Sequence, residues 1–249
     1  MNALFRVIAL AGFVLASAFA AEPAAKKEKA APKAPDDLTT QVGDGYRGIW
    51  YMNQPTKDEY VYKYSGGYAT YPQQHVPIAI YVASQRKTFF VFGGSAGRIS
   101  ESKDELQHYV SYYDHATGTV PRPVRILQKR TEDAHDNPTL SIDAAGHLFV
   151  FSSAHGTGRP SYIWRSKKPY DIAEWELIEK TNFSYTQPWY LPQSKRFLFL
   201  HTLYKNGQRT LNWKSSPDGR TWTASTLIDR KSTRLNSSHS DRSRMPSSA

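Results

Sequence analysis

The chain has 249 residues, of which 39% are hydrophobic and 13% aromatic, and it carries a formal net charge of +10. It contains no cysteine, which excludes both a disulfide framework and catalysis by a thiolate. The basic surplus is concentrated at the ends, because residues 1–35 and 229–249 contribute +3 each and leave only +4 for the middle. Such a mild surplus does not indicate a nucleic-acid-binding protein.

The first residues have the pattern of a secretory signal peptide, which we expect over residues 1–20. Arg6 supplies a positive start, Val7–Leu15 an apolar stretch too short to span a bilayer, and Ala18–Ala20 a cleavage site of small residues. Residues 21–36 are mainly Ala, Lys, Pro and Glu, which predicts a disordered linker. We therefore expect a secreted or periplasmic protein that has no membrane attachment after cleavage, and whose mild positive charge suits an acidic polysaccharide.

After the linker, short aromatic and β-branched runs separated by Gly, Pro, Asn and Asp predict an all-β chain. The runs repeat in groups of four, since Pro138 and Pro188 lie 50 residues apart and Trp175 and Trp222 lie 47 apart. The expected strands are 78–83, 88–92, 109–113 and 124–127, then 139–142, 148–151, 162–165 and 175–178, then 189–191, 197–200, 210–214 and 223–228. Further strands are expected near 48–51 and 61–64.

Four short antiparallel strands in each repeat are typical of a β-propeller and not of an immunoglobulin-like sandwich. The segment Ser216–Trp222 resembles an Asp-box, the hairpin of sialidase-like propellers, shortened by one residue. In such a hairpin Asp218 and Gly219 would form the turn and Trp222 would pack between blades. We expect a propeller of seven blades when complete, and residues 37–228 would be its incomplete N-terminal part with about three full blades.

The last stretch, residues 229–249, abandons the strand pattern and is rich in Ser and Arg. Its two parts, DRKSTRLNSSH and SRMPSSA, resemble an in-frame translation of a sequencing-library adapter. We expect this tail to be artefactual and the natural sequence to continue past Ile228 differently. The alternative is a basic disordered tail.

The propeller topology predicts which side chains share a face. Loops that enter an innermost strand and loops that join the second strand to the third open on the same face, whereas the turn residues Asp143 and Asp218 lie on the opposite face. The residues expected on the first face are His75, His135 and Tyr185 from entering loops, and His108, His155, Arg159, Tyr204 and Arg209 from the other loops. His108 and His115 are otherwise interpreted as ordinary loop residues.

Several segments together resemble the BNR-repeat family, which includes propeller polysaccharide lyases of the ulvan-lyase type. They are Gly45–Tyr51, Tyr64–Gly67, Tyr71–His75 and Asp133–Pro138. The resemblance covers about residues 43–228. It implies a site built from two His, a Tyr and an Arg, in some members with a bound zinc, and it carries the two imidazoles over to His135 and His155.

The residues themselves suit β-elimination from a uronate, which needs a cation on the carboxylate, a base for the C5 proton and an acid for the leaving oxygen. A His has a reference pKa of about 6.5 and therefore suits the base. We expect His135, His155 and Tyr185 to be catalytic. The expected substrate-binding residues are His75, Arg159, Tyr190 and Tyr204.

Structural roles stay open for each of these residues, as does a structural zinc or calcium ion. Two other functions are also open. One is a non-catalytic propeller that binds glycan or protein through its aromatic residues. The other is a sialidase-like glycoside hydrolase, for which Asp133 and Asp136 form no convincing acid and nucleophile pair. The full-length protein is expected to be a monomer.

Overall fold

The structure is a computed structural model that describes residues 35–43, 75–94, 106–131, 133–206 and 208–230. The expected signal peptide, nearly all of the linker, the strands expected near 48–51 and 61–64, and residues 231–249 lie outside these ranges. Among the described residues, no helix has the length and apolar character needed to cross a bilayer.

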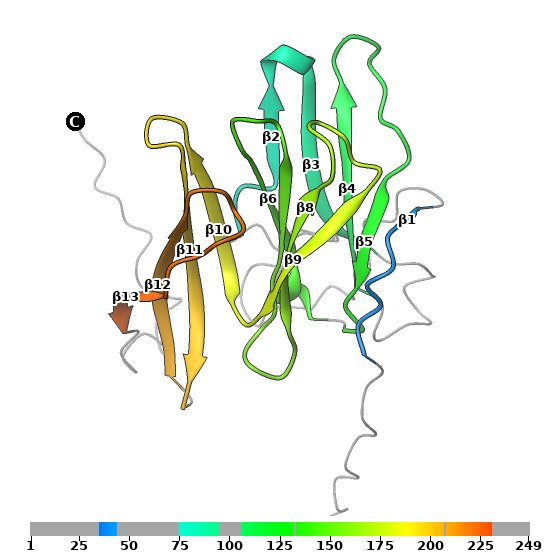
Figure 1. Ribbon diagram of the computed structural model, residues 1–249. Helices are drawn as coiled ribbons and strands as arrows, with labels where there is room; N and C mark the ends of the chain where they lie inside the picture. Colours follow the sequence, from blue (N-terminus) through cyan, green and yellow to red (C-terminus); the bar gives the residue numbers. More distant parts are fainter. Residues whose placement is uncertain (1–34, 44–74, 95–105, 132, 207, 231–249) are drawn as a thin grey trace, which may run out of the picture. The chain divides into compact units, whose positions relative to one another are not determined.

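The described residues form three antiparallel sheets and two short 3-10 turns (Figure 1). The first sheet has the order β1-β5-β4-β3-β2, the second β6-β7-β8-β9 and the third β10-β11-β12-β13. The strand bounds are β1 Gln41–Val42, β2 Ala79–Val82, β3 Lys87–Gly94, β4 Gln107–Asp114, β5 Val124–Gln128, β6 Pro138–Ile142, β7 Leu148–Ser152, β8 Ser161–Ser166, β9 Trp175–Thr181, β10 Ser184–Leu191, β11 Arg196–Lys205, β12 Gln208–Ser216 and β13 Thr226–Arg230. The turns are η1 Ala83–Gln85 and η2 Ala134–Asp136.

The prediction of an all-β chain with three repeats of four antiparallel strands is confirmed. Two features differ from the expectation. The first sheet gains β1 as a fifth strand, which pairs with β5 through Gln41–Arg125 and Val42–Val124. The third repeat begins at Ser184, five residues earlier than expected, because β10 contains an irregularity between Ser184 and Gln187 that keeps its first residues paired with β11.

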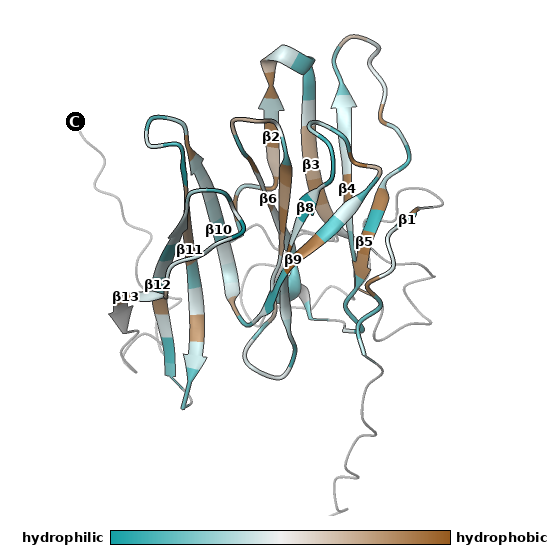
Figure 2. Cartoon of the chain, in the orientation of Figure 1, coloured by the Kyte–Doolittle hydropathy of each residue, from teal (hydrophilic) through white to brown (hydrophobic). Residues whose placement is uncertain are grey.

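The second strand of the middle sheet, β7, is buried on both faces, which explains why it reads as an almost continuous apolar run. Successive side chains of a strand point to opposite faces. Leu148 and Val150 of β7 accordingly pack in a cluster with residues of the first sheet, and Phe149 and Phe151 pack in another with residues of the third. Figure 2 shows these hydrophobic stretches, in brown, within the strands.

The first strands of the three repeats meet one another. β6 contacts both β2 and β10. The Leu140 N–H donates to the Pro77 carbonyl at 2.8 Å, the Val76 N–H donates to the Thr186 carbonyl at 3.2 Å, and the hydroxyls of Thr139 and Thr186 are 2.8 Å apart. Convergence of the first strands is what blades around one axis require, but the described residues form no closed ring, and the propeller stays a prediction.

The hairpin between β12 and β13 holds the third sheet against the middle one. Asp218 accepts hydrogen bonds from the N–H groups of Arg220 and Thr221, both at 2.8 Å, and Gly219 has a φ of +71°. The Trp222 ring contacts Phe151 of the middle sheet, with centroids 5.9 Å apart, and Phe199 of its own, at 5.8 Å. The expected packing of this tryptophan between repeats is therefore confirmed.

Candidate functional site

A single carboxylate, that of Asp133, organises the site. Asp133 is the N-cap of η2, and its own N–H donates to the Thr131 hydroxyl at 3.1 Å. One of its oxygens, Oδ1, accepts from the backbone N–H of His135 at 3.0 Å and lies 2.6 Å from Nδ1 of the same residue. The local turn thereby folds the His135 ring back onto the residue two positions earlier.

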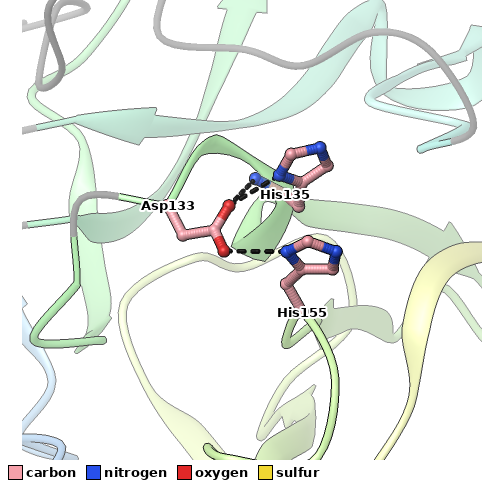
Figure 3. Close-up of side chains that lie close together, drawn as sticks. All are labelled: Asp133, His135 and His155. Atoms are coloured by element: carbon pink, nitrogen blue, oxygen red, sulfur yellow. Dashed lines mark hydrogen bonds and ion pairs between the residues drawn. The ribbon is translucent and has the colours of Figure 1, made fainter. Parts of the chain in front are cut away.

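The other oxygen of Asp133 holds a second imidazole from a distant part of the chain. His155 lies in the loop between β7 and β8, and its Nδ1 is 2.9 Å from Asp133 Oδ2. The two imidazole rings stack with centroids 4.2 Å apart and an interplanar angle of 27°. Figure 3 shows both rings turned toward the carboxylate through one nitrogen while the other nitrogen points away.

Buried charges beneath this pair fix the loop that carries His155. Asp136 is fully buried, accepts from the His155 N–H at 2.7 Å and binds Arg159 through two hydrogen bonds at 2.8 and 2.9 Å. Arg159 also reaches Asp133 Oδ2 at 3.2 Å. The ammonium group of Lys129, fully buried as well, lies 3.6 Å from Asp136 and donates to the Pro160 carbonyl at 2.6 Å. Arg159 is therefore committed to ion pairs within the protein.

The neighbouring sheet anchors the same loop. The side-chain amide of Asn182 donates to the carbonyls of Gly156 and Arg159 at 2.8 and 3.1 Å. The Ser184 hydroxyl donates to the carbonyl of Ala154 and accepts from the N–H of Gly156. Contacts from two sheets thus hold the loop, and the stacked rings are positioned before any ligand arrives.

Aromatic side chains surround the two imidazoles. The Tyr185 ring stands edge-on to His135 at 5.8 Å and to His155 at 5.9 Å between centroids, and lies 5.5 Å from the His75 ring. Tyr204 approaches His155 edge-on at 5.8 Å. Tyr185 has a φ of +50°, in the left-handed region that non-glycine residues seldom adopt, and such strain is often found at functional sites.

A cation lies over the same tyrosine. The guanidinium carbon of Arg209 is 4.7 Å from the centre of the Tyr185 ring. Arg209 is half-buried at the start of β12, opposite Tyr204 of β11. Within the described part of the chain, no ion pair engages this guanidinium, in contrast to Arg159. The two guanidinium groups near the histidines thus differ, since Arg159 is held in ion pairs and Arg209 lies over an aromatic ring.

The electrostatics of the site favour a charged Asp133. Burial raises the pKa of its carboxyl, but the hydrogen bonds from the rings of His135 and His155 and from the His135 N–H outweigh burial and hold the pKa well below its usual range. Burial, together with the nearby His135, lowers the pKa of His75 to about 3, so this imidazole is neutral at pH 7. Burial also lowers the pKa of Lys129, an effect opposed by Asp136 and Asp36.

Asp133, His135 and His155 place their ligand-type atoms within 4.8 Å of one another, so they form a candidate metal cluster. Their donor set fits a metal poorly. Zinc sites in proteins use three or four side-chain ligands, whereas four nitrogen atoms already lie within hydrogen-bonding distance of the Asp133 oxygens, among them Nδ1 of both rings. The Asp133 oxygens and both Nδ1 atoms are therefore directed at one another and not at a common metal position.

The structure brings together six of the seven residues expected at the site. His75, His135, His155, Arg159, Tyr185 and Tyr204 are linked by the contacts above. Tyr190 is not among them. It lies toward the other end of β10, opposite Phe197, where its ring packs against that side chain with centroids 5.1 Å apart. The turn residues Asp143 and Asp218 form hairpin turns away from this group, as expected.

Four residues that were expected in loops lie within strands. They are Tyr185 in β10, Tyr204 in β11, Arg209 in β12 and His108 in β4. His108 is not a loop residue but a fully buried part of β4. Burial lowers its pKa well below the usual value, and nearby Lys129 and His75 add to that effect. His115 does follow its strand, and its ring lies 2.8 Å from the Thr88 hydroxyl.

Sequence reasoning missed two residues. Asp133 was considered only as a hydrolase carboxylate, although its place two residues before His135 is the spacing of an N-cap that can accept from that His. Arg209 was placed on the correct face but not in the site. No local signal distinguishes it from Arg159, because only the tertiary structure shows which guanidinium is already paired.

Comparison with known proteins gives partial matches. The chain is 28% identical over 139 residues to an ulvan lyase of Nonlabens ulvanivorans, covering 46% of this chain and 29% of that protein. It is 30% identical over 141 residues to Ulvan Lyase-PL25 of Pseudoalteromonas sp. (strain PLSV), covering 46% of this chain and 28% of that protein. No family model matches. The chain is homologous to ulvan lyases over the aligned part, which is less than a third of their length.

Among solved structures, a PL25 ulvan lyase bound to -[GlcA(1-4)Rha3S]- superimposes with a TM-score of 0.49 at 18% sequence identity. That superposition covers 62% of this chain and 38% of the lyase. A second structure of such a lyase gives a TM-score of 0.49 at 16% identity, over 79% of this chain and 42% of that one.

Proposed function

We propose that this chain is part of an exported polysaccharide lyase that cleaves a uronate-containing polysaccharide by β-elimination, on a β-propeller of which the three sheets are blades. Homology to ulvan lyases supports the reaction class. The observation that carries the proposal is the stacked pair His135 and His155, held by one carboxylate beside Tyr185 and the cation of Arg209. The proposed partner is an acidic polysaccharide, and the proposed location is outside the cytoplasm.

The reaction needs three groups in one place. A base removes the C5 proton of the uronate, the electron pair forms the C4–C5 double bond, and the C4–O bond breaks as the leaving oxygen takes up a proton. An imidazole Nε2 of His135 or His155 is the base in this proposal, and Tyr185 supplies the proton. Both rings are partly exposed, with 19% and 34% of their surface accessible, so a sugar can reach them.

The carboxylate of the substrate must also be neutralised, because a full negative charge beside C5 opposes removal of the proton. We assign this role to Arg209 and not to Arg159, whose guanidinium is bound by Asp136 and Asp133. Arg159 then contributes indirectly, by holding the two carboxylates that hold the histidines. His75, buried behind Tyr185, supports the tyrosine and does not touch the substrate.

The geometry argues against a hydrolase that would use Asp133 and Asp136. An acid and nucleophile pair must both face the sugar. Asp136 is fully buried in ion pairs with Arg159 and Lys129, and both Asp133 oxygens accept hydrogen bonds. A non-catalytic glycan-binding protein would need only the aromatic residues. An assay for unsaturated product distinguishes this alternative from a lyase.

The test is incubation of the protein with ulvan while the ultraviolet absorbance of an unsaturated uronate is followed. We expect absorbance to rise with the wild type, and we expect His135→Ala and Arg209→Gln each to lose at least about 100-fold in kcat/KM. His115→Ala, whose ring lies at the end of β4 away from the pair, is the matched control and should keep full activity. Binding of ulvan without any unsaturated product would favour the binding protein, and reducing ends without unsaturation would favour a hydrolase.

A further inference from the structure

The carboxylate of Asp133 has no capacity left for a further donor. An ionised carboxylate accepts about four hydrogen bonds, two at each oxygen. Oδ1 faces the N–H and the ring Nδ1 of His135, and Oδ2 faces the ring Nδ1 of His155 and the Arg159 guanidinium. Four donors thus occupy the four positions.

This arrangement determines where the ring protons lie. A carboxylate without a proton can only accept, so each nitrogen that contacts it must be a donor. Nδ1 of His135 and Nδ1 of His155 therefore both carry hydrogen, and in the neutral imidazoles both Nε2 atoms are without one. In Figure 3 these two nitrogens point away from Asp133.

The supports of Asp133 keep this state in place. The Thr131 hydroxyl accepts its N–H, and Arg159, anchored in turn on Asp136, bridges to its Oδ2. The backbone of His155 is held independently by Asp136, so the ring cannot leave Asp133 by a shift of its loop without breaking a 2.7 Å hydrogen bond.

We propose that Asp133 is a shared positioning residue, which fixes both His135 and His155 in the Nδ1–H tautomer and so leaves both Nε2 atoms without a proton. This inference deepens the proposed function, because either ring can then accept a proton. The first to do so becomes an imidazolium that Asp133 stabilises, and repulsion across the 4.2 Å stack opposes a second charge on its neighbour.

The experiment is nitrogen-15 NMR of the histidine rings at neutral pH, which distinguishes the two tautomers directly. Signals of the pair are assigned from His135→Gln and His155→Gln, each of which removes one ring. We expect the Nδ1–H tautomer for both residues in the wild type. In Asp133→Asn the amide presents one oxygen and one NH2 donor, so at least one ring must change to the Nε2–H tautomer. Asp143→Asn, which alters a turn carboxylate away from the site, should change neither signal.

A wild-type spectrum with Nε2–H at either residue overturns the proposal, and so does an Asp133→Asn spectrum identical to the wild type. The wild-type spectrum decides even if the variant does not fold. Activity gives an independent result: Asp133→Asn should lower kcat by roughly 100-fold or more with little change in KM, since a base in the wrong tautomer cannot accept the proton. If the tautomers are as expected but no lyase activity exists, the positioning role stands and the proposed function fails.

Discussion

Replacing Asp136 by Asn tests the buried charge network that carries the site. Asp136 and the side chain of Lys129 have no accessible surface, and Asp136 also binds Arg159 and the His155 N–H. Asn keeps the shape and one acceptor but removes the negative charge. It therefore leaves the Lys129 ammonium in the interior with the more distant Asp36, at 4.0 Å, as its remaining acidic partner among the described residues.

The expected loss of stability follows from that geometry. Breaking a buried ion pair by removing one partner costs about 3–5 kcal/mol. Because Asn keeps an acceptor for the His155 N–H, we expect the loss of stability of Asp136→Asn to lie near the lower limit of this range, at about 3 kcal/mol. For a domain of about 200 residues, this loss lowers Tm by roughly 6–12 °C.

The assay is thermal and urea unfolding, followed by circular dichroism, of Asp136→Asn, Lys129→Met and the double variant. Because the two groups interact, the double variant should be more stable than the sum of the single losses implies, by about 1–3 kcal/mol. Asp143→Asn is the control, with an expected change below about 0.5 kcal/mol. A Tm of Asp136→Asn within 2 °C of the wild type, or strictly additive losses, would refute the reasoning.

Two further predictions concern stability away from the site. Burial lowers the pKa of His201 to about 4, whereas the unfolded chain has about 6.5. Between about pH 6.5 and about pH 4, His201 is therefore protonated in the unfolded state and neutral in the folded state. The free energy of unfolding should fall as the pH drops through this range. At about 1.4 kcal/mol per unit of pKa, the fall amounts to up to about 3 kcal/mol. His201→Gln should flatten this part of the stability curve in urea titrations, and an unchanged slope would contradict the assignment. Gly219→Ala should cost about 1–3 kcal/mol, because φ is +71° and a Cβ would clash with the buried Phe149 ring. Gly158→Ala, where a Cβ meets no atom within 4 Å, should melt like the wild type.

Most of the fold could be predicted from the sequence because strand formation here is a local property. Short runs of three to six residues, rich in apolar side chains and separated by Gly, Pro, Asn and Asp, marked all twelve strands of the three repeats. The fifth strand β1 was missed, since two exposed residues carry no apolar pattern and pair only because β5 lies beside them.

The candidate site could be predicted in part. The repeat indicated that entering loops and second-to-third loops share a face, and this placed His135 and His155 together although they are twenty residues apart. The separate expectation that Tyr190 binds substrate with this group does not fit the structure, because β10 is eight residues long and Tyr190 lies five residues after Tyr185, near the opposite end. The repeat did fail for His108, whose burial in β4 depends on neighbours that no local pattern reveals.

The sequence by itself determined the strands, their grouping into three repeats and the end of each repeat at which polar side chains gather, because these depend on periodicities along the chain. Only the tertiary structure decided which groups are available for chemistry. Arg159 and Arg209 are the same residue type, as are Asp133 and Asp136, so the sequence alone does not distinguish the two members of each pair. They differ because hydrogen bonds and ion pairs of about 3 Å engage Arg159 and Asp136 inside the protein, whereas Asp133 contacts two imidazoles and Arg209 lies over the Tyr185 ring.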